Sequence, residues 1–180
     1  MESVEVEVKF RCDDLGRIKK ELLDMKANYI DTVDMVDVYF QHPCRDFKSS
    51  DEALRVRLVK SYRTGEEIVE LTYKGPRIEG WAKSRVELIV KVNSFMEVLE
   101  MLGKLGFSKV ASITKHREFY LLDNVEVSLD NVEGLGSFVE LEDRGAGENG
   151  IRLVAEKLGL NELVHETYLE LYLKKFSLQV

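Results

Sequence analysis

Charged side chains recur at every second position in several short segments, and within each of these segments the charges share one sign. These pairs are Arg55/Arg57, Lys115/Arg117, Glu5/Glu7 and Glu140/Glu142. Carboxylate pairs are typical ligands of a hard divalent cation such as Mg²⁺ or Mn²⁺, whereas clustered Arg and Lys side chains suit phosphate oxygens. The residue types therefore predict a site that brings a divalent metal and a polyphosphate together.

Alternation of this kind is typical of β-strands, because successive side chains of a strand point to opposite faces. Residues 4–10 read Val-Glu-Val-Glu-Val-Lys-Phe and alternate strictly. We predict strands over residues 4–10, 35–40, 54–58, 68–74, 85–92, 114–117, 125–130 and 138–142. Each predicted strand has one charged face and one largely apolar face. Like charges two positions apart repel each other, so we expect groups of opposite charge to lie near them.

The helices indicate how this sheet is arranged. Apolar spacing predicts helices over residues 15–25, 95–102, 151–158 and about 161–175, and Ser94 and Glu97 form a capping box before the second. An open sheet with one solvated charged face is the simpler arrangement. A closed barrel with the charged faces inside and the helices packed outside fits the segregation of charge better. The fold class expected is therefore α+β with antiparallel strands.

Composition limits the partners. The 180 residues carry 26 basic and 33 acidic side chains, a net charge of −7, which argues against a surface for duplex nucleic acid or a basic track for an RNA strand. No apolar run reaches the roughly 20 residues of a membrane span, and the first residues lack the features of a secretory signal. The two cysteines have no metal-ligand spacing. We expect a single cytoplasmic domain over residues 1–180.

The charged segments also resemble, in order, the sequence blocks of the CYTH superfamily, the triphosphate tunnel metalloenzymes. Residues 5–9 match its ExExK signature, and the resemblance covers about residues 1–172. The further blocks lie at residues 37–40, 53–57, 72–76, 84–87, 115–117, 128–130, 134–142 and 167–171. The pattern is similar to the class IV adenylyl cyclase-like branch, which implies a closed eight-stranded antiparallel tunnel and a homodimer.

The resemblance implies roles for individual residues. The triphosphate would be held by Lys9, Arg55, Arg57, Lys74, Arg85, Lys115 and Arg117. One or two Mg²⁺ or Mn²⁺ ions would be held by Glu5, Glu7, Asp130, Glu140, Glu142 and Glu87. Catalysis would be carried by Glu5, Glu7, Lys9, Glu140 and Glu142. Ile89 stands where many relatives have a carboxylate, which weakens Glu87 as part of an acidic pair but not as a single ligand.

Membership of the superfamily leaves the reaction open. The branch implies a cyclase that converts ATP to cyclic AMP and pyrophosphate. The alternative is an organic or inorganic triphosphatase that releases orthophosphate from thiamine triphosphate or tripolyphosphate. A more remote alternative is a non-catalytic binder of nucleotide or polyphosphate, but a simple anion-binding site would gain from losing its carboxylates.

Overall fold

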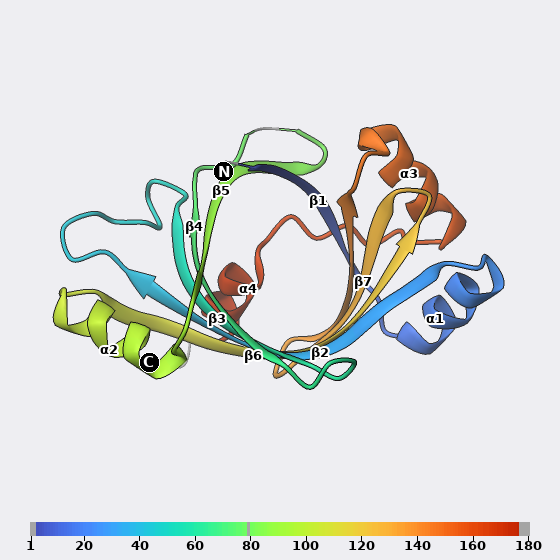
Figure 1. Cartoon of the computed structure of the whole chain (residues 1–180). Helices are drawn as coiled ribbons and strands as arrows, with labels where there is room; N and C mark the ends of the chain where they lie inside the picture. Colours follow the sequence, from blue (N-terminus) through green and yellow to red (C-terminus); the bar gives the residue numbers. More distant parts are fainter. Residues whose placement is uncertain (1–2, 79, 177–180) are drawn as a thin grey trace.

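The computed structural model, which describes residues 3–78 and 80–176, is a closed barrel of eight antiparallel strands (Figure 1). Around the barrel the strands follow the order β1-β5-β4-β3-β2-β6-β7-β8. Their bounds are β1 (Ser3–Arg11), β2 (Asn28–Gln41), β3 (Ala53–Ser61), β4 (Glu67–Lys74), β5 (Lys83–Val92), β6 (Ser108–Leu122), β7 (Val125–Val132) and β8 (Gly136–Asp143). The closed antiparallel barrel predicted from charge alternation and from the resemblance is confirmed.

Two strands are much longer than predicted. β2 has 14 residues and β6 has 15, whereas alternation indicated only residues 35–40 and 114–117. The two strands pair with each other from Asn28 opposite Leu121 to Gln41 opposite Ser108, with irregularities that shift the register twice. Each such shift turns the side chains to the other face, so one continuous alternation cannot mark the whole strand.

The register places opposite charges directly across from each other on the interior face. These cross-strand pairs are Glu5–Arg85, Lys9–Glu140, Asp37–Arg57, Lys74–Glu87 and Arg117–Asp130. Facing opposite charges stabilise a sheet by roughly 0.2–1 kcal/mol per pair. A slip of one residue would turn the charged sets toward the apolar outer layer. Charge pairing and burial therefore favour the same register.

Three helices cover the apolar outer face of the barrel. α1 (Leu15–Asp24) and α3 (Gly147–Lys157) lie side by side over β1, β7 and β8, where Ile18, Leu22 and Val154 pack in one core with Val8 and Leu141 (Figure 1). α2 (Phe95–Lys104) covers β2, β3 and β4 on the opposite side of the barrel. Among the described residues, no helix has both the length and the apolar character that crossing a bilayer requires.

The fourth helix, α4 (Tyr168–Phe176), contributes side chains to the interior of the barrel. Its start is set by a capping box, in which the Thr167 hydroxyl accepts from the Glu170 amide at 3.1 Å and the Glu170 carboxylate accepts from the Thr167 amide at 2.6 Å. The helix predicted near residues 161–175 therefore exists but begins later. The preceding residues are extended, because Val164 donates to the Lys9 carbonyl at 2.8 Å and Leu163 bridges to Phe10.

Candidate functional site

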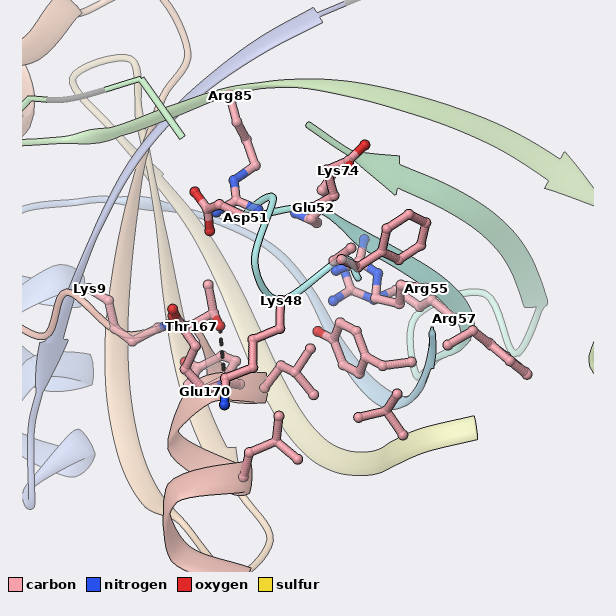
Figure 2. Close-up of a pocket in the computed structure, with 18 of the residues that line it drawn as sticks. Lys9, Lys48, Asp51, Glu52, Arg55, Arg57, Lys74, Arg85, Thr167 and Glu170 are labelled. Carbon is pink, nitrogen blue, oxygen red and sulfur yellow. Dashed lines mark hydrogen bonds between the residues drawn. The ribbon is translucent and has the colours of Figure 1, made fainter. Parts of the chain in front are cut away.

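The barrel encloses a cavity of about 820 Å³, within the usual range for a site that binds a small organic molecule. All seven cations predicted to bind a triphosphate line this cavity: Lys9, Arg55, Arg57, Lys74, Arg85, Lys115 and Arg117. Glu5, Glu7, Glu140 and Glu142 line it too. Figure 2 shows Lys9, Arg85, Lys74 and Arg55 arranged around the opening from different strands. The interior face thus brings together groups that are far apart in sequence.

Two of the guanidinium groups have buried nitrogens without a hydrogen-bond partner in the described part of the chain. These are Nε of Arg55 and Nη2 of Arg85, and both side chains are more than nine-tenths buried. Nη2 of Arg55 donates to the Thr72 hydroxyl at 3.3 Å. Leaving a buried charged donor unpaired costs free energy. Both arginines line the cavity, where an anion with several oxygens would offer acceptors to their guanidinium groups.

Arg57 and Lys74 are each held from behind by a carboxylate. Asp37 accepts a bidentate pair of hydrogen bonds from Arg57 at 2.6 and 2.7 Å, and Glu87 pairs with Lys74. Burial alone would raise the pKa of Asp37, but the guanidinium groups of Arg57 and Arg55 outweigh it and hold that pKa well below its usual range. The sequence blocks included residues 37–40, but Asp37 was given no role. Its position opposite Arg57 was the missing signal.

Lys9, Lys115 and Arg117 form a second group of cations around Asp130 and Glu140. Arg117 makes two hydrogen bonds to Asp130 and one to Glu140, while Lys9 lies 3.3 Å from Glu140 and Lys115 3.8 Å from Asp130. Burial would raise the pKa of Glu140, but Arg117, Lys9 and Lys115 together hold it well below the usual value. Asp130 and Glu140 are two of the six carboxylates that the sequence assigned to a metal, and in this structure each contacts two cations.

The remaining carboxylates gather where β1, β5 and β8 meet. Burial raises the pKa of Glu5, and a hydrogen bond with Glu87 acts in the same direction while Lys74 opposes it. Burial also raises the pKa of Glu142 to about 8, with Glu5, Glu126 and Glu7 adding to the shift. We call Glu5, Glu7, Glu87 and Glu142 the acidic end of the cavity. Glu5, Glu7 and Glu142 belong to its lining, whereas Glu87 is buried and does not.

Glu126 and Arg144 also belong to this neighbourhood, although sequence reasoning did not select them. Arg144 bridges Glu142, at 2.7 Å, and Glu126, at 3.1 Å. Glu126 lies directly across from Glu142 in the β7–β8 register. Glu126 lies two residues before Ser128 and four before Asp130, so all three share one face of the strand. This spacing could have identified Glu126 from the sequence.

The acidic end fits a hard divalent cation in its chemistry. All its donors are carboxylate oxygens, which Mg²⁺ and Mn²⁺ prefer, and the Glu87 Oε2 atom is buried without a partner among the described residues. A cation would relieve the repulsion that raises the pKa of Glu142. In this conformation no three of the described carboxylate, His or Cys side chains converge closely enough to form a finished metal site. The ligands would therefore come together as the ion binds.

A third part of the cavity wall is apolar or aromatic. It is formed by Tyr39, Phe40, Phe47, Val110, Leu169 and Leu173. These side chains come from β2, β6, α4 and the loop between β2 and β3. Such a surface gives no favourable contact to an inorganic polyphosphate but can stabilise an organic ring system by burial and stacking. The cavity therefore combines seven cationic side chains, an acidic end and an apolar wall.

An ion-pair bridge fixes α4 beside the cavity. Arg77, in the loop after β4, lies 2.8 Å from both Asp51 and Glu170. Asp51 belongs to the loop before β3, and Glu170 is the capping residue of α4. Arg77 thus ties two loops to the helix. Sequence reasoning gave none of these residues a role, because the three lie far apart along the chain and on no common strand face.

Lys115 is expected to take up a proton when a polyphosphate binds. Burial, with the neighbouring Arg117 guanidinium adding to it, lowers the pKa of Lys115 to about 7. A bound polyanion favours the charged ammonium and raises that pKa, so binding of tripolyphosphate at pH 8 draws up to one proton from solvent. Calorimetry in two buffers of different ionisation enthalpy measures this uptake. The Lys115→Arg variant stays charged throughout, so its binding of tripolyphosphate should take up fewer protons by the share that Lys115 contributes. Equal proton uptake by the variant and the wild type would contradict this role of Lys115.

Known proteins have similar sequences, and a solved structure among them has the same architecture. The family model of the CYTH domain matches residues 3–173. A Methanocaldococcus jannaschii protein named "Putative adenylate cyclase" is 36% identical over 177 residues, covering 93% of this chain and 98% of that protein. Adenylate cyclase CyaB of Aeromonas hydrophila is 28% identical over 138 residues, covering 76% and 67%. A solved structure from Pyrococcus horikoshii OT3 has a TM-score of 0.82 at 37% identity, covering 95% and 99%. The chain therefore belongs to the CYTH domain family, in its class IV adenylyl cyclase-like branch.

Proposed function

We propose that this protein is a divalent-metal-dependent enzyme that converts ATP to cyclic AMP and pyrophosphate. The observation that carries the triphosphate assignment is the lining of one cavity by seven cations. Two of them, Arg55 and Arg85, have a buried guanidinium nitrogen without a partner among the described residues. The names of the relatives support the cyclase reaction. The apolar wall supports a substrate with an organic group over an inorganic polyphosphate.

The chain's own residues have separable roles in this reaction. Arg55, Arg57, Lys74 and Arg85 neutralise and orient the phosphate chain, as phosphoryl and nucleotidyl transfer require. The ribose 3′ oxygen forms a bond to the α-phosphorus, its proton is lost to a base, and pyrophosphate leaves with the electrons of the broken P–O bond. The cationic wall stabilises the charge that develops on the leaving group.

The acidic end is assigned to the metal. Glu5, Glu7, Glu87 and Glu142 would hold Mg²⁺ or Mn²⁺, which when bound neutralises phosphate charge and polarises the phosphoryl group. We assign Asp130 and Glu140 instead to holding Lys9, Lys115 and Arg117 in place, because each of these two carboxylates contacts two of the cations. Glu87 differs, because it pairs with Lys74 through Oε1 but keeps a buried Oε2 atom without a partner among the described residues. A non-catalytic binder is less well supported, since carboxylates at the cavity wall would weaken anion binding without serving a metal.

Product analysis tests the proposal. The purified protein is incubated with Mn²⁺ or Mg²⁺ and ATP, thiamine triphosphate or tripolyphosphate, and the products are separated by chromatography. Cyclic AMP with an equal amount of pyrophosphate is the expected result. Release of orthophosphate without cyclic AMP would establish a triphosphatase and refute the cyclase reaction. Failure of every substrate to turn over, with no binding of tripolyphosphate, would refute the triphosphate site itself.

Leu173→Asn should separate organic from inorganic substrates. Leu173 lines the cavity but belongs to none of the core clusters of the described residues, so this change of similar volume removes apolar contact without a large effect on folding. Loss of about 1.5 kcal/mol of apolar burial corresponds to about tenfold weaker ATP binding. The Kd for tripolyphosphate should change less than twofold. Equal weakening of both ligands would place the organic group elsewhere.

A further inference from the structure

Tyr168, the first residue of α4, is buried inside the barrel and contacts two of the cavity lysines. The Nζ atom of Lys9 lies 3.8 Å from the centre of the Tyr168 ring, and that of Lys115 lies 5.0 Å from it. The ring also meets Phe138 edge to face, with centroids 5.2 Å apart. An aromatic face within about 6 Å attracts an ammonium group. The ring is therefore placed to hold both lysines at once.

The hydroxyl of Tyr168 reaches a third cation indirectly. It donates a hydrogen bond to Asp130 Oδ2 at 2.6 Å, and Asp130 accepts two hydrogen bonds from Arg117. Asp130 is fully buried and does not belong to the described cavity lining. One side chain thus contacts Lys9 and Lys115 with its ring and orients Arg117 through a carboxylate.

These contacts are needed because the cations repel each other. Lys115, Arg117 and Arg57 are close enough for the two guanidinium groups to lower the Lys115 pKa, and a lysine side chain is a flexible stem that ends in a point charge. The segment that precedes α4 also restrains Lys9, because the Lys9 ammonium donates a hydrogen bond to the Glu166 carbonyl at 3.1 Å. Without fixed contacts these ammonium groups would move apart and lose their common orientation toward the cavity.

We infer that Tyr168 is a positioning residue of the triphosphate site, with its ring fixing Lys9 and Lys115 and its hydroxyl fixing Arg117 through Asp130. The C-terminal segment is then part of the binding site and does more than cover the barrel. This inference rests on the proposed function, because it requires that the cavity binds a triphosphate. A purely structural Tyr168, packed with Phe138 in the core, would instead affect binding only in proportion to its effect on stability.

Three variants separate these roles. Tyr168→Phe keeps the ring and removes only the hydrogen bond to Asp130. Tyr168→Leu keeps an apolar side chain but removes the aromatic face as well. Phe138→Leu is the matched control, because it removes the neighbouring ring from the same core cluster, and Phe138 contacts neither Lys9 nor Lys115 in the described contacts.

The measurement is calorimetric binding of tripolyphosphate in the absence of metal, with the thermal midpoint of each variant recorded in parallel. We expect the Kd to rise about 5-fold in Tyr168→Phe and about 50-fold in Tyr168→Leu, so that Phe rescues most of what Leu loses. Phe138→Leu should lower the thermal midpoint as much as Tyr168→Leu but change the Kd less than threefold. Affinity losses that follow stability across all three variants would overturn the inference.

An Arg85→Met variant distinguishes failure of the inference from failure of the proposed function. If the wild type binds tripolyphosphate and Arg85→Met does not, the site is established whatever Tyr168 does. If both Tyr168 variants then bind like the wild type, only the positioning role is refuted. If the wild type does not bind tripolyphosphate, the proposed function fails and the inference fails with it. Tyr168→Phe preserves the volume of the side chain, so its result is informative even if Tyr168→Leu does not fold.

Discussion

Replacing Arg85 by Met is expected to weaken tripolyphosphate binding about a hundredfold while raising the stability of the free protein. Arg85 is 7% exposed, and its Nη2 atom has no partner among the described residues. Hydrogen bonds to charged groups contribute about 1.5–3 kcal/mol each, and a loss near 3 kcal/mol corresponds to about a hundredfold in Kd. A buried charged donor without a partner costs the free protein free energy. We expect this cost to exceed the roughly 0.2–1 kcal/mol contributed by the cross-strand pairing with Glu5, so an apolar replacement should raise the thermal midpoint.

The opposite signs of these two effects make the test specific. An ordinary core mutation would lower stability and weaken binding together. Arg63→Met is the matched control, because Arg63 is an exposed arginine in the turn between β3 and β4 and does not belong to the cavity lining. It should leave the Kd within about twofold. Calorimetry with tripolyphosphate and thermal unfolding without ligand measure both quantities, and unchanged affinity in Arg85→Met would refute the role of the unpartnered donors.

Replacing Glu142 by Gln should abolish metal-dependent turnover. The pKa of Glu142 is raised to about 8 by burial and by Glu5, Glu126 and Glu7, so at pH 7 a divalent ion must displace a proton from this carboxyl group. The apparent affinity for Mn²⁺ should therefore rise nearly tenfold per pH unit from pH 6 to about pH 8 and level off above it. In Glu142→Gln we expect at least a hundredfold weaker Mn²⁺ binding and no such rise.

Glu126→Gln is the control for this second prediction. It leaves Glu142 in place but removes one carboxylate that raises the Glu142 pKa, so the levelling-off point should move to lower pH while Mn²⁺ still binds. Electron paramagnetic resonance of free Mn²⁺ gives the affinities without any assay of turnover. A Glu142→Gln protein that binds Mn²⁺ like the wild type, or a pH-independent wild-type affinity, would contradict the assignment of the acidic end.

Much of the site could be predicted because charged residues occupy every second position along the strands. Arg55 and Arg57, or Glu5 and Glu7, lie two residues apart, and a strand sends both side chains to one face whatever its neighbours are. Segregation of charge by strand favoured a closed barrel, and the resemblance to the CYTH sequence blocks implied one with eight strands. All seven predicted cations do line one cavity. The cap at Ser94, the apolar faces of α1, α2 and α3 and most of the strand positions likewise depend on local patterns, but the full lengths of β2 and β6 do not.

By contrast, only the tertiary structure decided which charged side chains contact each other. Whether a carboxylate faces a cation or another carboxylate depends on barrel register: Asp130 and Glu140 meet Arg117, whereas Glu142 lies near Glu5. Tyr168 reaches this network because the chain before α4 pairs with β1, a contact between residues more than 150 positions apart. Alternation within one strand sets the face of a side chain. Its neighbour, and with it its pKa and its role, is set by long-range pairing that no local pattern encodes.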